Sequence, residues 1–449
     1  MLEFVGARIL ADEDTVFRNT WNPAFGLWKP EYRRVDASLA ERREPVFEDL
    51  LEVEERPAPT LPVLWRGYAE PGDSLGNVTW RSLEALRRLG LAGFVRFLPI
   101  QDPAREVVPG DAERRSEERR GEFPCANPES ATRPGTERLE FQVPGLSPST
   151  LPAGSCVRFL YGEFGAFLPL PYAARDILWA PSRHVEESLR RSFPRHRTIR
   201  VPHGVDLGLF HPAESEREDS SRRGMPGCGR PFRFLYVGTT LSRKGFDLVL
   251  DAYEAERSRM PDSELVLKLS PTWSGFRSLL GREGAPGIRV VEDHLSEGSL
   301  ADLMRSCDVL VAPARSEGFC LPVLEAMACG IPAIVPDGGA TDDFCPDDCR
   351  YSVRAERAVS RRHLDTVLTW LEPNLDSLRA EMRRAHADPS EARARGARGA
   401  RFARAYSWEN VVKRLLEESL RVPGEDSARV VDSRDGRVAD QWREGADLA

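Results

Sequence analysis

The stretch SEGFCLPVLEAMACG, residues 316–330, contains two carboxylates, Glu317 and Glu325, ahead of and within a predicted helix. Pro322 and Gly330 bracket that helix in the usual order, with proline in the first turn and glycine just past the end. The apolar run DVLVAP before it is typical of a buried strand, so SEGFC is a strand-to-helix loop. Free N–H groups and the helix dipole at such a loop attract phosphate.

An acid beside an anion site makes chemical sense if it meets hydroxyl groups, which is what we expect of Glu317. Glu325 lies about one turn into the helix, where a carboxylate can accept paired hydrogen bonds from a vicinal diol such as ribose. Phosphate between two hydroxyl-bearing groups describes a sugar nucleotide. The alternative is that both acids are solvated surface residues, which is the commoner case for an acid pair with this spacing alone.

The rest of the chain predicts the elements that would position these residues. In the second half, strands at 232–238, 264–270, 308–313 and 331–336 alternate with helices at 246–260 and 299–307. In the first half, the sequence predicts strands at 61–67, 94–100, 139–143, 156–163, 176–181 and 198–204. Helices are predicted there at 78–90, ending at Gly90, and at 182–193, capped by Ser182. Alternating strands and helices predict parallel sheets.

The fold class expected is therefore α/β, with two Rossmann-like, doubly wound parallel-sheet domains facing each other across a cleft. Ligands of such sheets bind at the carboxyl ends of the strands. We expect domains at 61–205 and 232–420, joined by a linker at 206–231 that is rich in glycine, serine and charge. Residues 1–60 are predicted to be an irregular arm that packs on the surface or binds a partner protein. Residues 102–138 are predicted to be a mobile insertion, and 421–449 a polar tail.

Composition favours a soluble globular protein. The 449 residues are 41% hydrophobic and 30% charged, and the net charge is −8, so nucleic acid is not an expected partner. No apolar run approaches the roughly 20 residues that span a bilayer, and the amino terminus lacks a secretion signal, so we expect a cytoplasmic location. The eight cysteines form no CxxC pair, and no metal site is predicted.

Residues 316–330 resemble the E-x7-E motif of the retaining GT-B glycosyltransferases of group 1, which usually reads SEGFGLP followed by LEAMACG. Other segments resemble that family in the same order along about residues 61–420. They are PHGVDLGLFHP (202–212), VGTTLSRKGFD (237–247), GGATDDF (338–344) and YSWENVVKRLL (406–416). The resemblance implies a GT-B fold in which the second domain binds the donor.

The resemblance also implies roles for individual residues. Glu317 would contact hydroxyls of the donor sugar and Glu325 the ribose, while Lys244, preceded by Arg243, would neutralise the diphosphate. Only four of the 63 basic residues are lysines, which supports the match at Lys244. The remaining donor-side candidates are Gly238, Thr239, Lys268, Gly318 and the backbone amides of Phe319, Cys320 and Leu321. Lys268 lies on a predicted strand and either contacts the donor or extends to the surface.

Three departures from the family pattern carry expectations of their own. Cys320 stands where the family usually has glycine, so the loop should have less freedom to adopt a positive φ. Thr239 stands where many relatives have arginine, so Arg243 would carry that charge. None of the seven histidines fits the place of the histidine that many relatives have near the reacting carbon, and His203 is interpreted as structural.

On the acceptor side, the segment GDSLGN is predicted to be a loop that completes the cleft, with candidates Gly72, Ser74, Gly76 and Asn77. A turn without a ligand is equally consistent with that segment. Glu163 matches a glutamate of some relatives and is a further acceptor candidate. The basic run at 392–405 is interpreted as a solvated helix face.

The activity expected is transfer of a hexosyl unit from a nucleotide-diphosphate sugar to a hydroxyl of a glycan, lipid or small-molecule acceptor, with retention of configuration. No Asp-x-Asp metal motif is found, so the reaction is expected to need no metal and no other cofactor. Two alternatives stay open. One is a phosphorylase or epimerase of the same fold, and the other is a non-catalytic subunit that binds a partner transferase.

Overall fold

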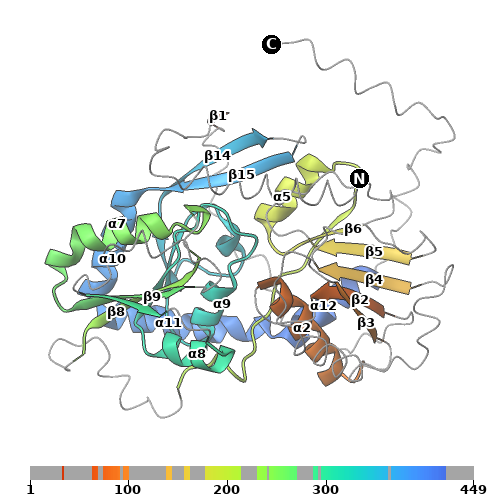
Figure 1. Cartoon of the computed structure of the whole chain (residues 1–449), viewed down its shortest axis with the longest axis horizontal. Coiled ribbons are helices and arrows are strands. Elements are labelled where there is room, and N and C mark those ends of the chain that lie inside the picture. The colour runs from red at the N-terminus through yellow and green to blue at the C-terminus, as the bar shows by residue number, and fades with distance from the viewer. Residues whose placement is uncertain are drawn as a thin grey trace, which may run out of the picture.

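The computed structural model describes residues 33–34, 63–68, 74–91, 95–100, 138–143, 156–161, 177–213, 230–239, 242–269, 287–291, 295–362 and 366–420. The predicted arm at 1–60, apart from Arg33–Arg34, lies outside these residues. So do the insertion at 102–137, most of the linker after residue 213, and the tail. Figure 1 shows the described elements as two lobes that lie side by side.

The first lobe is built on a six-stranded sheet in the order β3-β2-β4-β5-β6-β7, with every neighbouring pair parallel. Its strands are β2 (Val63–Tyr68), β3 (Val95–Ile100), β4 (Arg138–Val143), β5 (Cys156–Tyr161), β6 (Ile177–Ala180) and β7 (Thr198–Arg200). Two helices, α2 (Ser74–Arg88) and α5 (Arg183–Ser192), accompany it. The six predicted strands are confirmed, and the connections between them are long enough for the crossovers that parallel pairing requires.

The second lobe contains another six-stranded parallel sheet, in the order β10-β9-β8-β11-β12-β13. Its strands are β8 (Phe232–Gly238), β9 (Ser263–Leu269), β10 (Ile288–Val291), β11 (Val309–Val311), β12 (Ala333–Pro336) and β13 (Arg350–Val353). Helices α7 (Phe246–Glu256) and α10 (Leu375–Ala387) pack on one face, and α8 (Glu297–Arg305) and α9 (Leu321–Ala328) on the other. Burial on both faces explains the continuous apolar character of these strands. The predicted doubly wound fold is confirmed.

A third, antiparallel sheet was not predicted. The hairpin of β14 (Ala355–Arg362) and β15 (Thr366–Pro373) pairs with the two-residue strand β1 (Arg33–Arg34) along the free edge of β14. The hairpin reaches α5 of the first lobe, where Arg357 forms an ion pair of 3.3 Å with Glu187 (Figure 1). It therefore connects the second lobe to the first on one side of the interface.

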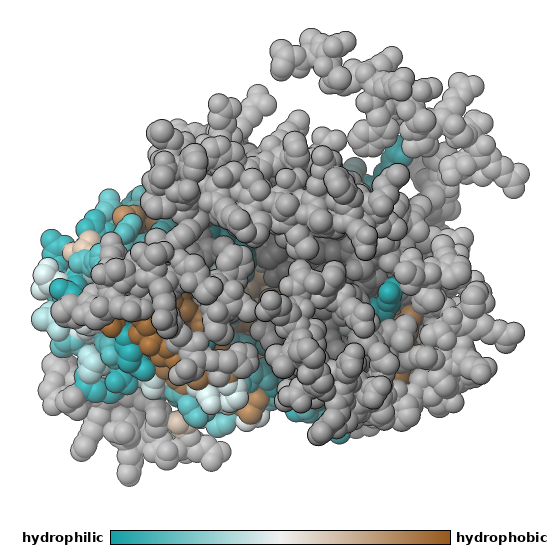
Figure 2. Space-filling view, in the orientation of Figure 1, coloured by the Kyte–Doolittle hydropathy of each residue, from teal (hydrophilic) through white to brown (hydrophobic). Residues whose placement is uncertain are grey.

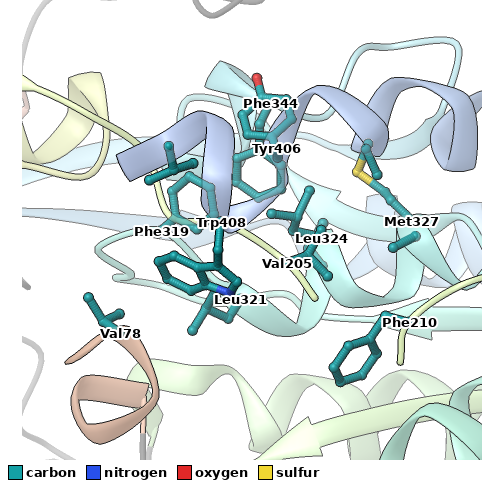
Figure 3. Close-up of a cluster of buried hydrophobic side chains, with 14 of the residues drawn as sticks. Val78, Val205, Phe210, Phe319, Leu321, Leu324, Met327, Phe344, Tyr406 and Trp408 are labelled. Carbon is teal, nitrogen blue, oxygen red and sulfur yellow. The ribbon is translucent and has the colours of Figure 1, made fainter. Parts of the chain in front are cut away.

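The two lobes also share a hydrophobic core. The last helix, α12 (Trp408–Leu420), follows the second sheet in sequence but packs against α2 of the first lobe. One buried cluster runs from Val78 on α2 through Trp408 to Phe319 and Leu324 in the second lobe (Figure 3). Burial of a continuous apolar surface across the two lobes favours a fixed contact between them.

The predicted loop GDSLGN is wrong in part, because α2 begins at Ser74 and includes Gly76 and Asn77. Gly76 is buried, so packing of the first turn outweighs the low helix propensity of glycine. Gly72 and Glu163, the other acceptor-side candidates, lie outside the described residues. The predicted end at Gly90 is confirmed, since Gly90 has φ 77° and the N–H of Leu91 bonds to the carbonyl of Leu86.

The basic run at 392–405 lies mostly in α11 (Pro389–Ala403), and the solvated-face interpretation is wrong for one side of that helix. Its small residues Ala392, Gly396, Gly399 and Ala403 are buried, and α11 packs against α9. The arginines project from the remaining sides. Arg395, for example, donates hydrogen bonds to the carbonyls of Asp347 and Arg350. A basic helix with glycine every third or fourth residue can therefore pack closely on one face.

None of the helices in the described part of the chain combines the length and the apolar character needed to cross a membrane. Figure 2 shows hydrophilic residues over much of the described surface of the second lobe, with smaller apolar areas among them.

Candidate active site

The loop between β11 and α9 forms the centre of the candidate site, as predicted. Pro322 lies in the first turn of α9, and Gly330 follows the helix with φ 80°. The N–H of Ile331 bonds back to the carbonyl of Ala326, which closes the helix end. The loop SEGFC therefore leads directly into a helix amino terminus, where unpaired N–H groups are available to an anion.

The segment with Arg243 and Lys244 lies against this loop because Gly245 lets the two backbones meet. Gly245 has φ 73°, and a Cβ atom built on it would stand 2.1 Å from the carbonyl oxygen of Pro313. The N–H of Arg315 donates to the carbonyl of Arg243 at 2.7 Å, and Nη1 of Arg243 donates to the carbonyl of Ser316 at 2.9 Å. Any side chain at position 245 would push the segment that contains Arg243 and Lys244 away from the loop after β11.

These contacts bring the three predicted catalytic residues together. Nζ of Lys244 lies 2.5 Å from Oε1 of Glu317, and Nη1 of Arg243 lies 3.5 Å from Oε2. Burial would raise the pKa of Glu317, but the positive charges of Lys244 and Arg243 outweigh burial and lower that pKa. Glu317 is therefore held as a carboxylate, and its side chain is 11% exposed.

Cys320 has φ 77° and ψ 65°, which makes it the one residue other than glycine with a positive φ in the described part of the chain. The expectation that cysteine would restrict this conformation is therefore wrong for the backbone that the chain adopts, although the strain of such a conformation costs about 1–2 kcal/mol. Burial raises the pKa of its thiol to about 12. A neutral thiol is a poor nucleophile.

The side chain of Phe319 anchors the loop while its backbone N–H faces away from other acceptors. The ring stacks on Phe344 at a centroid distance of 4.3 Å (Figure 3). It also makes an edge contact with the ring of His203 at a centroid distance of 5.0 Å. Among the described residues, no acceptor is within hydrogen-bonding geometry of the N–H groups of Phe319 and Cys320. Burial lowers the pKa of His203 to about 3, so its ring is neutral and the structural interpretation agrees with its packing.

Glu325 lies on α9 in a different environment from Glu317. Its side chain is partly buried, and its carboxylate forms no hydrogen bond or ion pair within the described residues. Burial, assisted by the negative charge of Glu297, raises the pKa of Glu325 to about 8, and Arg81 of the first lobe opposes the shift. A half-buried carboxyl group without a partner is suited to accept or donate hydrogen bonds to a diol.

The other donor-side candidates end the central strands. Gly238 is the last residue of β8, and the carbonyl of Thr239 accepts a hydrogen bond of 2.5 Å from the hydroxyl of Tyr236. The Thr239 hydroxyl is buried and has no partner within the described residues. Lys268 is buried near the end of β9, where its ammonium donates to the carbonyl of Leu269 at 2.7 Å. Lys268 therefore does not extend to the surface.

Sequence reasoning missed the contribution of α5. His184, set aside with the other histidines, lines a pocket together with Glu317, Cys320 and Thr341. Ser182, predicted only as a helix cap, also donates a hydrogen bond to the carbonyl of Gly318. The polar residue types of the segment SRH, 182–184, were visible in the sequence. Their contact with residues 317–320 depends on how the two lobes are placed, which no local sequence pattern indicates.

Two parallel doubly wound sheets facing each other define the GT-B glycosyltransferase fold, and this chain has that fold. The structure of HepE from Anabaena in complex with UDP matches it with a TM-score of 0.56 at 12% identity, over 80% of this chain and 99% of that chain. Residues 231–359 match the family model described as Glycosyl transferases group 1. Over residues 231–359 the chain is therefore similar to the group 1 glycosyltransferases, in agreement with the sequence resemblance.

Two curated relatives share the same name. The chain is 35% identical over 139 residues to D-inositol 3-phosphate glycosyltransferase of Arthrobacter sp. (strain FB24), covering 30% of this chain and 32% of that protein. It is 27% identical over 234 residues to the D-inositol 3-phosphate glycosyltransferase of Kineococcus radiotolerans, covering 49% of this chain and 51% of that protein. The alignments thus span a third to a half of these relatives.

Proposed function

We propose that this protein transfers a hexosyl unit from a nucleotide-diphosphate sugar to an acceptor hydroxyl, with retention and without a metal. The observation that carries the proposal is the paired environment of the two acids. Glu317 is held ionised by Lys244 and Arg243 beside free backbone N–H groups, and Glu325 presents a carboxyl group without a partner one turn into the same helix.

A diphosphate at the start of α9 would meet the N–H groups of Phe319 and Cys320, the helix dipole and the ammonium of Lys244. Departure of the sugar leaves negative charge on that diphosphate, and preorganised positive groups stabilise the charge as it develops. Glu317 would orient the sugar through its hydroxyls, and Glu325 would hold the ribose. Cations and a helix end supply the electrostatic stabilisation for which other transferases use a metal, so EDTA should leave the rate unchanged.

The nucleotide is identified by a thermal-shift screen across UDP, GDP, ADP, TDP and CDP sugars, in which the true donor raises the melting temperature. Activity is then measured with that donor. Lys244→Ala should lower kcat by about 100-fold or more, because a group that stabilises the leaving diphosphate is lost. Lys413→Ala, a lysine of α12, is the matched control and should retain full activity.

Two results would contradict the proposal. One is full transferase activity in both Lys244→Ala and Glu317→Gln. The other is a rate that EDTA abolishes and manganese restores, which would remove the metal-independent part. The anomeric configuration of the product, read by NMR, tests retention separately.

A further inference from the structure

The first turn of α5, in the first lobe, is hydrogen-bonded to the motif loop of the second lobe. Ser182 is fully buried, and its hydroxyl donates to the carbonyl oxygen of Gly318 at 2.7 Å. The hydroxyl oxygen of Ser182 also accepts a hydrogen bond of 3.3 Å from the N–H of Val185 and so caps α5. One hydroxyl therefore serves a helix of one lobe and a loop of the other.

The direction of the Gly318 carbonyl determines the direction of the next N–H group. Gly318 and Phe319 share a planar peptide unit, and in the usual trans form the C=O and N–H bonds point to opposite sides. Because the carbonyl points to Ser182, the N–H of Phe319 points away from α5. Like the N–H of Cys320, that N–H has no acceptor among the described residues.

A second contact fixes α5 against the same region. The N–H of Arg183 donates to Oδ2 of Asp343 at 2.5 Å, and Asp343 belongs to the loop after β12. The side chain of Asp343 is 3% exposed, so its carboxylate is a well-defined anchor. With His184 lining the pocket beside Glu317, three consecutive residues, the cap Ser182 and the first two residues of α5, meet the donor side.

We propose that Ser182 is a positioning residue, which sets the orientation of the Phe319 amide for the donor phosphate through its hydrogen bond to Gly318. The inference rests on the proposed function in one respect, namely that the amide binds phosphate. It makes the donor site depend on the first lobe, because the hydroxyl that orients the loop belongs to that lobe.

Two variants separate the two bonds of the Ser182 hydroxyl. Ser182→Ala removes both, whereas Ser182→Asp keeps an acceptor for the Val185 N–H but cannot donate to a carbonyl as a carboxylate. Asn374→Ala is the control for loss of a cap, since the Asn374 side chain caps α10 through the N–H of Ser377 at 2.8 Å and α10 packs within the second lobe. The measurements are amide hydrogen exchange without ligand and the affinity for UDP, GDP, ADP, TDP and CDP by calorimetry.

In both Ser182 variants we expect exchange at residues 318–321 to be about tenfold faster, with exchange in α10 unchanged. We also expect the affinity for the nucleotide that binds the wild type to fall about five- to tenfold, the effect of one hydrogen bond. Unchanged exchange at 318–321, or an equal effect of Asn374→Ala, would overturn the inference. A wild type that bound none of UDP, GDP, ADP, TDP and CDP would count against the proposed function, and the exchange result would still decide whether Ser182 orders the loop.

Discussion

Glu317 and Glu325 lie eight residues apart and have opposite ionisation behaviour. Lys244 and Arg243 keep the pKa of Glu317 low in spite of burial, whereas Glu325 is buried without a cation in contact and its pKa rises to about 8. One acid is therefore charged across the physiological range and the other is largely protonated at neutral pH. In the proposed roles, Glu317 would therefore present a fixed negative charge to the donor sugar. Glu325 would present to the ribose a carboxyl group that can donate as well as accept hydrogen bonds.

The raised pKa of Glu325 predicts how stability depends on pH. Between pH 4.5, the ordinary pKa of a glutamate, and about pH 8, the folded state binds more protons at this residue than the unfolded state. Stability must therefore fall as pH rises through that window, and each pKa unit corresponds to about 1.4 kcal/mol. Glu325→Gln cannot titrate, so we expect its free energy of unfolding to fall by less between pH 5 and pH 8.

Urea unfolding of the wild type and of Glu325→Gln at pH 5, 6, 7 and 8 measures the difference. Glu356→Gln, which replaces an exposed acid of β14, is a control for removal of a carboxylate. Parallel stability curves for the wild type and Glu325→Gln would refute the assignment of the titration to Glu325.

At this scale the sequence was informative about residue identity and less so about conformation. The acid pair could be proposed because the types and spacing of the two residues match the chemistry of a sugar nucleotide, and Lys244 because its segment resembles the group 1 family. The positive φ of Cys320 could not, because a cysteine disfavours it locally and the buried Phe319 and the helix that follows impose it.

At the scale of elements, α9 holds its position through glycines of α11. A Cβ atom on Gly396 would lie 2.0 Å from the carbonyl oxygen of Gly330, and one on Gly399 would lie 3.4 Å from Cγ of Met327. The first distance is a clash with backbone, and the second is an ordinary contact with a flexible side chain. The end of α9 is thus fixed by backbone approach at a single position of α11.

These two glycines form a matched pair of variants. Gly396→Ala should destabilise the protein by about 2–3 kcal/mol, because either α11 or Gly330 must move. Gly399→Ala should be neutral or stabilising by up to about 1 kcal/mol, because alanine has the higher helix propensity. Chemical denaturation compares the two, and equal effects would show that backbone approach does not limit the packing of α11 on α9.

The hairpin of β14 and β15 shows where prediction of elements failed. β14 has the sequence AERAVSRR, without the alternation of apolar and polar residues that marks a half-buried strand. Its pairing is with β15 and with two arginines far away in the sequence. By contrast, the six strands of the first sheet and β8, β9, β11 and β12 of the second could be predicted from short apolar runs, which are typical of strands covered by helices. The edge strands β10 (Ile288–Val291) and β13 (Arg350–Val353) were not predicted.

At the scale of the whole molecule, Arg81 of α2 joins the two lobes. It forms ion pairs with Glu297 of the second lobe and with Asp206 in the connecting segment, the latter at 2.6 Å. Arg88, about two turns further along α2, also contacts Asp206 at 3.6 Å and Glu409 at 3.1 Å. The side chain of Arg81 is 11% exposed and that of Arg88 is 43% exposed.

This difference in burial predicts unequal effects. Arg81→Ala leaves the buried carboxylate of Asp206 with a weaker partner and should cost about 3 kcal/mol. Arg88→Ala removes a solvated pair and should cost less than about 1 kcal/mol. Unfolding experiments measure both values, and small-angle X-ray scattering should show a larger radius of gyration for Arg81→Ala alone. A similar loss in both variants would contradict a special role of Arg81 between the lobes.

The two parallel sheets followed from the order of elements, but contacts between the lobes did not. Arg81 and Glu297, like Ser182 and Gly318, are more than 100 residues apart, and nothing in their local sequence pairs them. The family resemblance placed the donor residues together because all of them lie in the second lobe. It could not place α5 or α2 against that lobe.

The return of α12 to α2 means that the chain does not divide cleanly into two pieces at its midpoint. A fragment ending near residue 213 would leave one apolar face of α2 bare, and a fragment beginning near residue 230 would carry α12 with nothing to cover it. Each piece made alone would therefore be prone to aggregate. If both fragments were produced in the same cell, burial of these apolar surfaces would favour their association, with α12 of one fragment packed against α2 of the other.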